Sequence, residues 1–558
     1  EEADLVLKEL EDLYRDESLG LHGSPGFCAA RATFAREKGE NELAEQRYEK
    51  CLELFPSEAL VLEEAVQFFD DSGQFERSEQ ILARALEDAP AAHAIRFHLV
   101  RRLLARGAAE TAEKLVREAT TLPSLADAAT GWSNLALWEI HQGRFDAAAD
   151  AFARARDLDP THSVELSFGY ADALAVAGRY EQALRVAEET GLPTYQALVR
   201  GRVALLRGDP QQALEQLSEG VRLWPDNAMA RYYLAVAAEQ TGDFALAVEQ
   251  YRYAIRIDVR STDAYLRLAR LHAAEGRLDE AVSILSFQPG GRPEELTAGL
   301  LHLEILARLD LLPPTHLQRF FSHPDRRARA LAAVARGRTA RRGPAEAAKY
   351  LREQKIDLTD PVHAPALEAL VEALGASGHS EEGLVLADAG QRRHPEAAAF
   401  HALRGRALIL SRRPSASARA AYERALAIDA GHSQALIGLA RLHVESGKRD
   451  SALEFYERAL IVAPDDRDTA RDAAKLLSAL ERRDEAEERL AGLLRAHPYD
   501  APAALALAEL RLARGADDER TRELVRRAVH FRGGPPAEAL LERLGSRSKT
   551  VISTVDGG

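Results

Sequence analysis

A glycine that recurs about every 34 residues is the feature that most limits how this chain of 558 residues can fold. A fixed period of this length is typical of arrays in which one small supersecondary unit is stacked many times. Three longer intervals of 67 to 69 residues fit two repeats each, with Asp310, Glu481 and the neighbourhood of Arg413 at the missing turns. The chain therefore holds about 15 repeats. The recurring glycines are Gly39, Gly73, Gly107, Gly143, Gly178, Gly208, Gly242, Gly276, Gly343, Gly378, Gly447 and Gly515.

Each repeat carries small residues at a helical spacing. Gly143 is followed by Ala148, Ala155 and Pro160, and the repeat of Gly447 has the same spacing. Two small residues seven apart lie on one helical face and let a second helix approach closely, while Pro ends a helix. With 46% hydrophobic residues but only 6% aromatics, the core must be built from Ala, Leu and Val, which suits packed helices better than β-sandwiches. The pattern predicts an all-α solenoid of helix-turn-helix units.

This pattern resembles the tetratricopeptide repeat family, in register from about residue 25 to residue 534. The resemblance implies two antiparallel helices per repeat, stacked into a right-handed superhelix whose inner surface is lined mainly by the first helix of each pair. No single repeat buries its apolar face alone, so stability accumulates along the stack. One full match to the family pattern is formed by Trp132, Leu135, Ala136, Gly143, Phe145, Ala148, Phe152, Ala155 and Pro160.

Departures from the period divide the chain. We expect an N-terminal capping helix at 1–24, or the second helix of a truncated repeat, followed by an array of about eight repeats at 25–295. Pro and Gly then interrupt 296–328, which we interpret as a degenerate repeat or hinge, ordinary drift being the alternative. A second array of about six repeats covers 329–534, and 535–558 is predicted to form a C-terminal helix and an extended tail.

No spacing in the chain points to catalysis. A His-Glu-x-x-His stretch, a Gly-x-x-x-x-Gly-Lys loop and a strand-associated Gly-x-Gly-x-x-Gly are all absent from the sequence. His394 and His497 fill the inter-repeat position that holds Asp159 elsewhere, and we interpret them as loop residues. We therefore expect a protein that is not an enzyme, with no cofactor and no metal.

Charge and hydropathy narrow the class of partner. The formal net charge is -15, and base-stacking aromatics are few, which argues against nucleic acid. Seven arginines within 326–342 form a cluster of the kind that binds phosphates, but we interpret them as a solvated helix face. No apolar run reaches the length of a membrane span. The remaining partners are other proteins or peptide segments, with no indication of an oligomeric state.

The two cysteines, Cys28 and Cys51, fall in the first complete repeat at positions that an antiparallel helix pair places opposite each other. They form either a disulfide, which would indicate an oxidising compartment, or two reduced thiols in small-residue positions. The sequence does not begin with Met, and we interpret this as a signal peptide or anchor removed or left out upstream. The bacterial periplasm and the cytoplasm both stay open, the bacterial origin being inferred from abundant Ala and Arg.

The inner face holds the candidate binding residues. Basic residues recur at the ninth position of the first helix, and they predict a basic ridge that suits acidic segments or a C-terminal carboxylate. The alternative is that these side chains pair with acids on the next helix. Tyr232, Tyr233 and Arg267 add rings and a guanidinium of the kind found in binding hot spots. The ridge consists of Arg101, Arg202, Arg270, Arg406, Arg441 and Lys475.

Together these features predict a non-enzymatic scaffold or adaptor. It would hold partner segments in the concave groove of the superhelix through many weak contacts. An alternative function is the substrate-recruiting arm of a larger enzyme, for example a glycosyltransferase, with a catalytic domain outside this chain.

Overall fold

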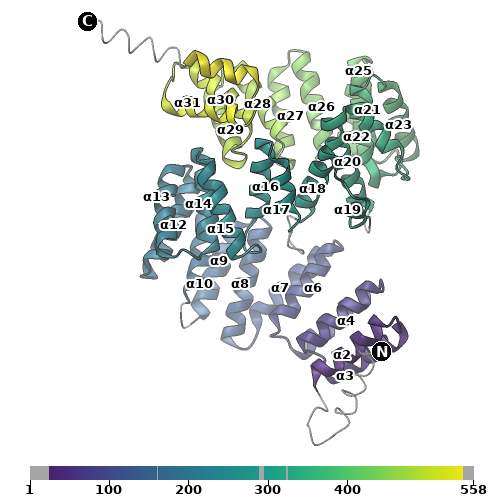
Figure 1. Cartoon of the computed structure of the whole chain (residues 1–558), viewed down its shortest axis with the longest axis vertical. Helices are drawn as coiled ribbons and strands as arrows, with labels where there is room; N and C mark the ends of the chain where they lie inside the picture. Colours follow the sequence, from purple (N-terminus) through teal and green to yellow (C-terminus); the bar gives the residue numbers. More distant parts are fainter. Residues whose placement is uncertain (1–23, 160, 162, 288–294, 322–323, 545–558) are drawn as a thin grey trace, which may run out of the picture. The chain divides into compact units, whose positions relative to one another are not determined.

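The computed structural model describes residues 24–544 apart from 160, 162, 288–294 and 322–323. The chain divides into two compact units, Glu1–Asp209 and Pro210–Gly558. Figure 1 shows the helices in chain order. No strand occurs in the described part of either unit, and the predicted all-α solenoid is confirmed. The predicted capping helix, apart from Ser24, and the tail beyond residue 544 lie outside the described residues.

The N-terminal unit consists of successive helix pairs and one further helix. Each helix packs against the next one in the chain. The helices are α2 (Pro25–Glu37), α3 (Asn41–Leu54), α4 (Ala59–Asp71), α5 (Phe75–Asp88), α6 (His93–Ala105), α7 (Ala109–Glu118), α8 (Leu125–His141), α9 (Phe145–Leu158), α10 (Val164–Val176), α11 (Tyr180–Glu189) and α12 (Pro193–Arg207), with a short 3₁₀ turn, η2 (Ala119–Thr121), before α8.

The C-terminal unit begins with α13 (Pro210–Leu223) and continues in pairs. Residues 535–544 form a further short helix after the last pair. The remaining helices are α14 (Ala228–Thr241), α15 (Phe244–Ile257), α16 (Ala264–Glu275), α17 (Leu278–Leu285), α18 (Glu295–Leu309), α19 (Pro314–Gln318), α20 (Pro324–Arg342), α21 (Pro344–Arg352), α22 (Ala364–Ala376), α23 (Ser380–Arg393), α24 (Ala398–Leu410), α25 (Ser415–Ile428), α26 (Ser433–Glu445), α27 (Arg449–Val462), α28 (Arg467–Ala479), α29 (Arg483–Ala496), α30 (Ala501–Ala513) and α31 (Glu519–His530), with η3 (Pro361–His363) before α22.

The recurring glycines are the turns between the two helices of a pair. Each has a positive φ, between 72° and 91°, which places it where a Cβ atom is unfavourable. The replaced turns have the same left-handed backbone, with φ of 61° at Asp310 and 58° at Glu481. The third replaced turn is at Arg412, one residue before the predicted Arg413. Gly343 differs from the others because it precedes α21 as its N-cap, with ψ of 170°.

Small residues on facing helices recur in the core, between larger Leu, Phe and Tyr side chains. Ala148 and Ala155 on α9 are fully buried, and Ala452 and Ala459 on α27 repeat this. An alanine at these positions lets the axes of neighbouring helices come close, and the burial of many such faces stabilises the stack. The predicted seven-residue spacing of small residues therefore corresponds to the packing interface.

The region around residue 310 departs from the regular hairpin. Its second helix, α19, has only five residues, and α18 packs directly against α20. Phe320, 5% exposed, fills the space beside Gly299, where a Cβ atom would lie 2.8 Å from the ring. The hinge predicted here stays a prediction.

Cys28 on α2 and Cys51 on α3 are bonded through their sulfur atoms, with Cα atoms 5.7 Å apart. We propose that this disulfide staples the first described helix pair. Alkylation under denaturing conditions without reductant, followed by mass spectrometry, would leave both cysteines unmodified if the bridge forms and modify both if it does not.

The left-handed turn at Arg412 generates a stability prediction. Arg412 is exposed and forms no side-chain hydrogen bond or ion pair with the described residues. We expect Arg412→Gly to stabilise the chain by about 0.5 to 1 kcal/mol, because relief of the left-handed strain exceeds the entropy that glycine adds to the unfolded state. Urea unfolding followed by circular dichroism measures this. The control, Arg392→Gly inside α23, should destabilise by about 1 kcal/mol; equal losses in the two variants would contradict the prediction.

Candidate functional site

The six residues of the predicted basic ridge lie on the first helix of their pairs. Arg101 and Lys475 are exposed, on α6 and α28. Three others pair with carboxylates on the first helix of a neighbouring repeat. Arg202 contacts Asp172 at 3.0 Å, Arg406 forms two bonds to Glu372 at 2.5 and 2.9 Å, and Arg441 approaches Asp472 at 3.4 Å.

This pairing recurs at a position that the sequence analysis did not select. Arg102, next to Arg101, forms two bonds to Asp70 of α4, at 2.5 and 2.7 Å. The separation of 32 residues is close to one repeat, so stacking itself brings acid and base together. These arginines therefore pair with acids on a neighbouring helix, as the alternative interpretation expects, and the acids offset the charge of three of the six ridge residues.

Tyr232, Tyr233 and Arg267 belong to a largely buried cluster. The Arg267 Nε donates to the Tyr232 hydroxyl at 3.1 Å, and its Nη1 lies 3.4 Å from a carboxylate oxygen of Glu239, which is fully buried. The Tyr251 hydroxyl donates to the same oxygen at 2.8 Å. Burial raises the pKa of Glu239, and the charge of Arg267 opposes that shift. The cluster joins α14, α15 and α16, and Tyr233 is only 8% exposed.

Arg270 is the ridge residue not yet described, and it faces the segment between α29 and α30. Burial raises the pKa of Tyr499, and the charge of Arg270 opposes that rise. Burial lowers the pKa of His497, and nearby arginines, among them Arg270, lower it further. This part of the inner face therefore lies against the chain's own C-terminal repeats.

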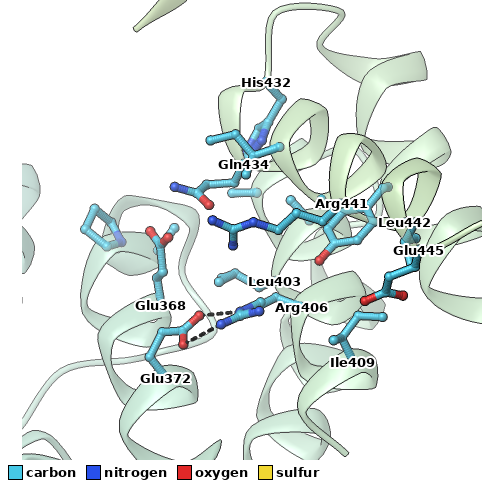
Figure 2. A pocket seen from close by; sticks show the side chains of 17 residues that line it. Glu368, Glu372, Leu403, Arg406, Ile409, His432, Gln434, Arg441, Leu442 and Glu445 are labelled. Atoms are coloured by element: carbon cyan, nitrogen blue, oxygen red, sulfur yellow. Dashed lines mark hydrogen bonds and ion pairs between the residues drawn. The ribbon is translucent and has the colours of Figure 1, made fainter. Parts of the chain in front are cut away.

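A pocket of about 280 Å³ opens on three successive first helices, α22, α24 and α26 (Figure 2). The Tyr422 ring of α25 forms part of its wall, between Gly405 of α24 and Gly438 of α26. A Cβ atom at Gly405 would lie 2.6 Å from the ring, and one at Gly438 would also collide with it. These glycines are needed for the ring to sit there, and they are the sequence signal that could have located the pocket.

The pocket brings together two of the predicted ridge arginines and polar side chains that the sequence analysis did not select. Figure 2 shows Arg441 extending toward Gln434 and the side of the pocket that carries Glu368. Within the described chain, Glu368 and Gln434 form no side-chain hydrogen bond or ion pair, whereas Arg406 is paired with Glu372. Burial and then the charge of Glu372 raise the pKa of Glu368. The pocket thus offers two carboxylates without a partner among the described residues, one amide and one guanidinium whose ion pair is long.

The tyrosine wall is apolar and buried. Burial raises the pKa of Tyr422 to about 12, so the hydroxyl stays protonated at neutral pH. Leu403, Ile437 and Leu442 also belong to the apolar part of the lining. A pocket with an apolar wall and a few convergent polar groups is suited to holding a side chain or a short segment of a partner.

The other candidate groups lie in packing positions. His394 stacks on Phe400, with ring centroids 6.1 Å apart. Among the described residues, no three His, Cys, Asp or Glu side chains are grouped as a metal site would require. No helix in the described part of the chain combines the length and apolarity needed to cross a membrane.

Two family models described as tetratricopeptide repeat match the chain. One matches residues 99–163, 198–260 and 368–433, and the other residues 139–200, 238–294 and 415–480. Together they cover more than half of the sequence. The chain belongs to the tetratricopeptide repeat family. Tetratricopeptide repeat proteins bind other proteins, and this one has the architecture of a protein-interaction scaffold.

No curated protein matched in the sequence comparison. Among solved structures, the chain is similar to the Cut9-Hcn1 hetero-tetramer of the APC/C, with 14% identity, TM-score 0.32 and coverage of 97% of this chain and 98% of that one. Naa15/Naa10 bound to HypK-THB gives 13% identity, TM-score 0.31 and coverage of 98% and 94%. Yeast Tom70 gives 13% identity, TM-score 0.31 and coverage of 96% and 99%. Similarity at this level transfers no partner to the chain.

The buried cluster generates a prediction about stability. Arg267→Met should destabilise the protein by about 3 to 5 kcal/mol, because it leaves the buried Glu239 without a compensating charge. Adding Glu239→Gln should recover most of this loss, since the amide oxygen still accepts from Tyr251. Urea unfolding of the two single variants and the double variant measures the coupling. Losses that simply add would show that Arg267 stabilises the fold independently of Glu239.

Proposed function

We propose that the chain is a non-enzymatic scaffold that holds extended segments of partner proteins on its concave surface, and that the pocket on α22, α24 and α26 is one of the binding points. The observation that carries this proposal is the incomplete pairing of the pocket. Arg202 and Arg406 pair with carboxylates of the chain, whereas Glu368 has no partner among the described residues and Arg441 reaches Asp472 only at 3.4 Å, beside a contact with the Tyr456 hydroxyl.

The chemistry of the pocket favours a segment with mixed character. The Arg441 guanidinium and the Gln434 amide donate hydrogen bonds, which suits a carboxylate or a main-chain carbonyl of the partner. The Glu368 carboxylate accepts, which suits a basic side chain or a main-chain N–H. The wholly acidic segment expected from the ridge alone fits less well, because Glu368, Glu372 and Glu445 all line the pocket. We therefore propose a carboxylate-bearing segment with a donor beside it.

A single pocket of this size supplies only part of the affinity of a scaffold. Weak contacts along one extended segment act together, because binding at the first raises the local concentration at the next. The exposed ridge residue Lys475 lies on α28, another first helix of the same unit, and is available for such a contact. Partner choice would then depend on the spacing of charged residues along the segment.

Photo-crosslinking tests whether the pocket contacts a partner. Benzoylphenylalanine at Gln434 should crosslink to a partner protein in the cells that produce the chain, and the same residue at Ile461 serves as the control. Ile461 is 81% exposed on α27 and lies outside the pocket lining. Crosslinked products that are the same from both positions would contradict the proposed site.

Charge variants then test the chemistry on the partner identified in this way. Arg441→Glu and Glu368→Lys should each weaken its binding tenfold or more, because each removes one charge-assisted hydrogen bond and introduces repulsion. Arg392→Glu, an exposed charge change of the same size on α23, should leave the dissociation constant within about twofold. Isothermal titration calorimetry measures the dissociation constants of all three variants. Equal weakening by Arg392→Glu would show that the net charge of the chain, and not the pocket, determines the effect.

A further inference from the structure

The last helix pair of the C-terminal unit contacts the first two complete pairs of the same unit. The Arg527 Nη2 on α31 donates to the main-chain oxygen of Gln240 at 3.0 Å, and the Gln240 side chain lies 3.4 Å from the main-chain oxygen of Arg495. His530 at the end of α31 contacts the Glu275 carboxylate at 2.9 Å. These partners are 255 to 287 residues apart in the sequence. We call this set of residues, together with Phe244 and Phe531, the closing contact.

Aromatic rings form the centre of the closing contact. Phe244 stacks on His530, with centroids 5.2 Å apart, and meets Phe531 edge to face at 4.6 Å. Phe244 is 8% exposed. Phe75 occupies the same repeat position, two residues after the turn glycine, and is 59% exposed. The difference indicates that α31 covers the Phe244 ring, because rings at the same position are exposed at Phe75 and only half-buried at Phe145 and Tyr180.

The turn glycines give independent evidence for a close approach. At nine of the turns described above, from Gly39 to Gly515, an added Cβ atom would meet nothing within 4 Å. At Gly242 it would collide with Glu523, and at Gly276 with the guanidinium of Arg532. The atoms in the way are the ends of flexible side chains, so the collisions show that the C-terminal repeat lies close against these two turns.

The closing contact also contains an unbalanced charge. Arg527 is 6% exposed and forms no ion pair with the described residues. Burial lowers its pKa, and the charges of Glu523 and Glu239 oppose that shift. A buried cation held by one carbonyl and one aromatic face is less stable than a paired one, which favours a contact that opens reversibly.

The closing contact lies next to the candidate binding surface of α14 and α16. Tyr499 and His497, which follow α29, face Arg270, and Tyr499 also lies within the electrostatic influence of Glu239 and Arg267. The section of the inner face that carries the predicted hot-spot residues is thus occupied from within the chain.

We propose that the closing contact is an internal latch: the C-terminal repeats occupy the α14–α16 surface, and a partner segment reaches that surface only when the latch opens. The availability of this surface to a partner rests on the proposed scaffold function, whereas the opening itself does not. Opening separates one contact and leaves every neighbouring helix pair stacked, so it requires no unfolding of a repeat.

Two measurements on the full chain test the latch. Hydrogen exchange followed by mass spectrometry reports the opening of 240–247 and 527–533, and hydroxyl-radical footprinting reports the exposure of the Tyr232 and Tyr499 rings. Gly276→Asn should open the contact, because asparagine tolerates the left-handed backbone but its side chain displaces Arg532. Gly447→Asn has the same backbone change with open space around it and is the matched control.

We expect at least tenfold faster exchange of both segments in Gly276→Asn, with faster oxidation of Tyr232 and Tyr499, and no change in Gly447→Asn or at Tyr422. His530→Ala, at a side chain that is 45% exposed, should give a change in the same direction without affecting folding. Exchange and oxidation equal to wild type in both variants would overturn the proposal. So would a wild-type closing contact that exchanges only together with the cores of α14 and α31, because the contact would then be a permanent part of the fold. If Arg441→Glu and Glu368→Lys leave partner binding unchanged while the exchange and oxidation rates rise as expected, the proposed binding point is overturned and the latch is still supported.

Discussion

Close approach of helices at small residues is the constraint on which the rest of the structure depends. A helical hairpin of this length cannot bury its apolar face by itself, so each pair requires a neighbour at a nearly constant distance. Ala148 and Ala155 on α9 keep that distance because they add no bulk to the interface. The left-handed glycine turns reverse the chain between the two helices of a hairpin. Once these two conditions hold along the chain, equivalent positions of neighbouring repeats lie next to each other.

That juxtaposition explains why part of the basic ridge is neutralised. Charges at equivalent helical positions would repel between neighbouring repeats, and acids one repeat away relieve the repulsion. Asp172 and Glu372 act in this way toward Arg202 and Arg406. A surface suited to a partner then arises where the pairing is incomplete. The pocket around Arg441 is such a place, and its apolar wall depends on two glycines that make room for Tyr422.

The local features of the fold could be predicted from the sequence, because period, turn chemistry and small-residue spacing act over one repeat. Even the glycine-free turns at Asp310 and Glu481 were located by their register. The closing contact could not be predicted from the sequence. It joins residues more than 250 positions apart and depends on small rotations that accumulate over many repeats. Phe75 and Phe244 show the difference: the repeat pattern makes them equivalent, but only one is buried. Likewise Arg406 and Arg441 share a repeat position and differ in pairing.

The two kinds of contact in the C-terminal unit differ in how they contribute to stability. Stacking contacts recur at every pair, so losing one disrupts a core that its neighbours share. The closing contact occurs between repeats that are not neighbours, and its buried Arg527 forms no ion pair with the residues that the structure describes. Its loss would separate Phe244 from α31 while the stack on either side remains intact. A solenoid built in this way has a low-energy route to changing which part of its inner face is accessible, and that route does not require any helix to unfold.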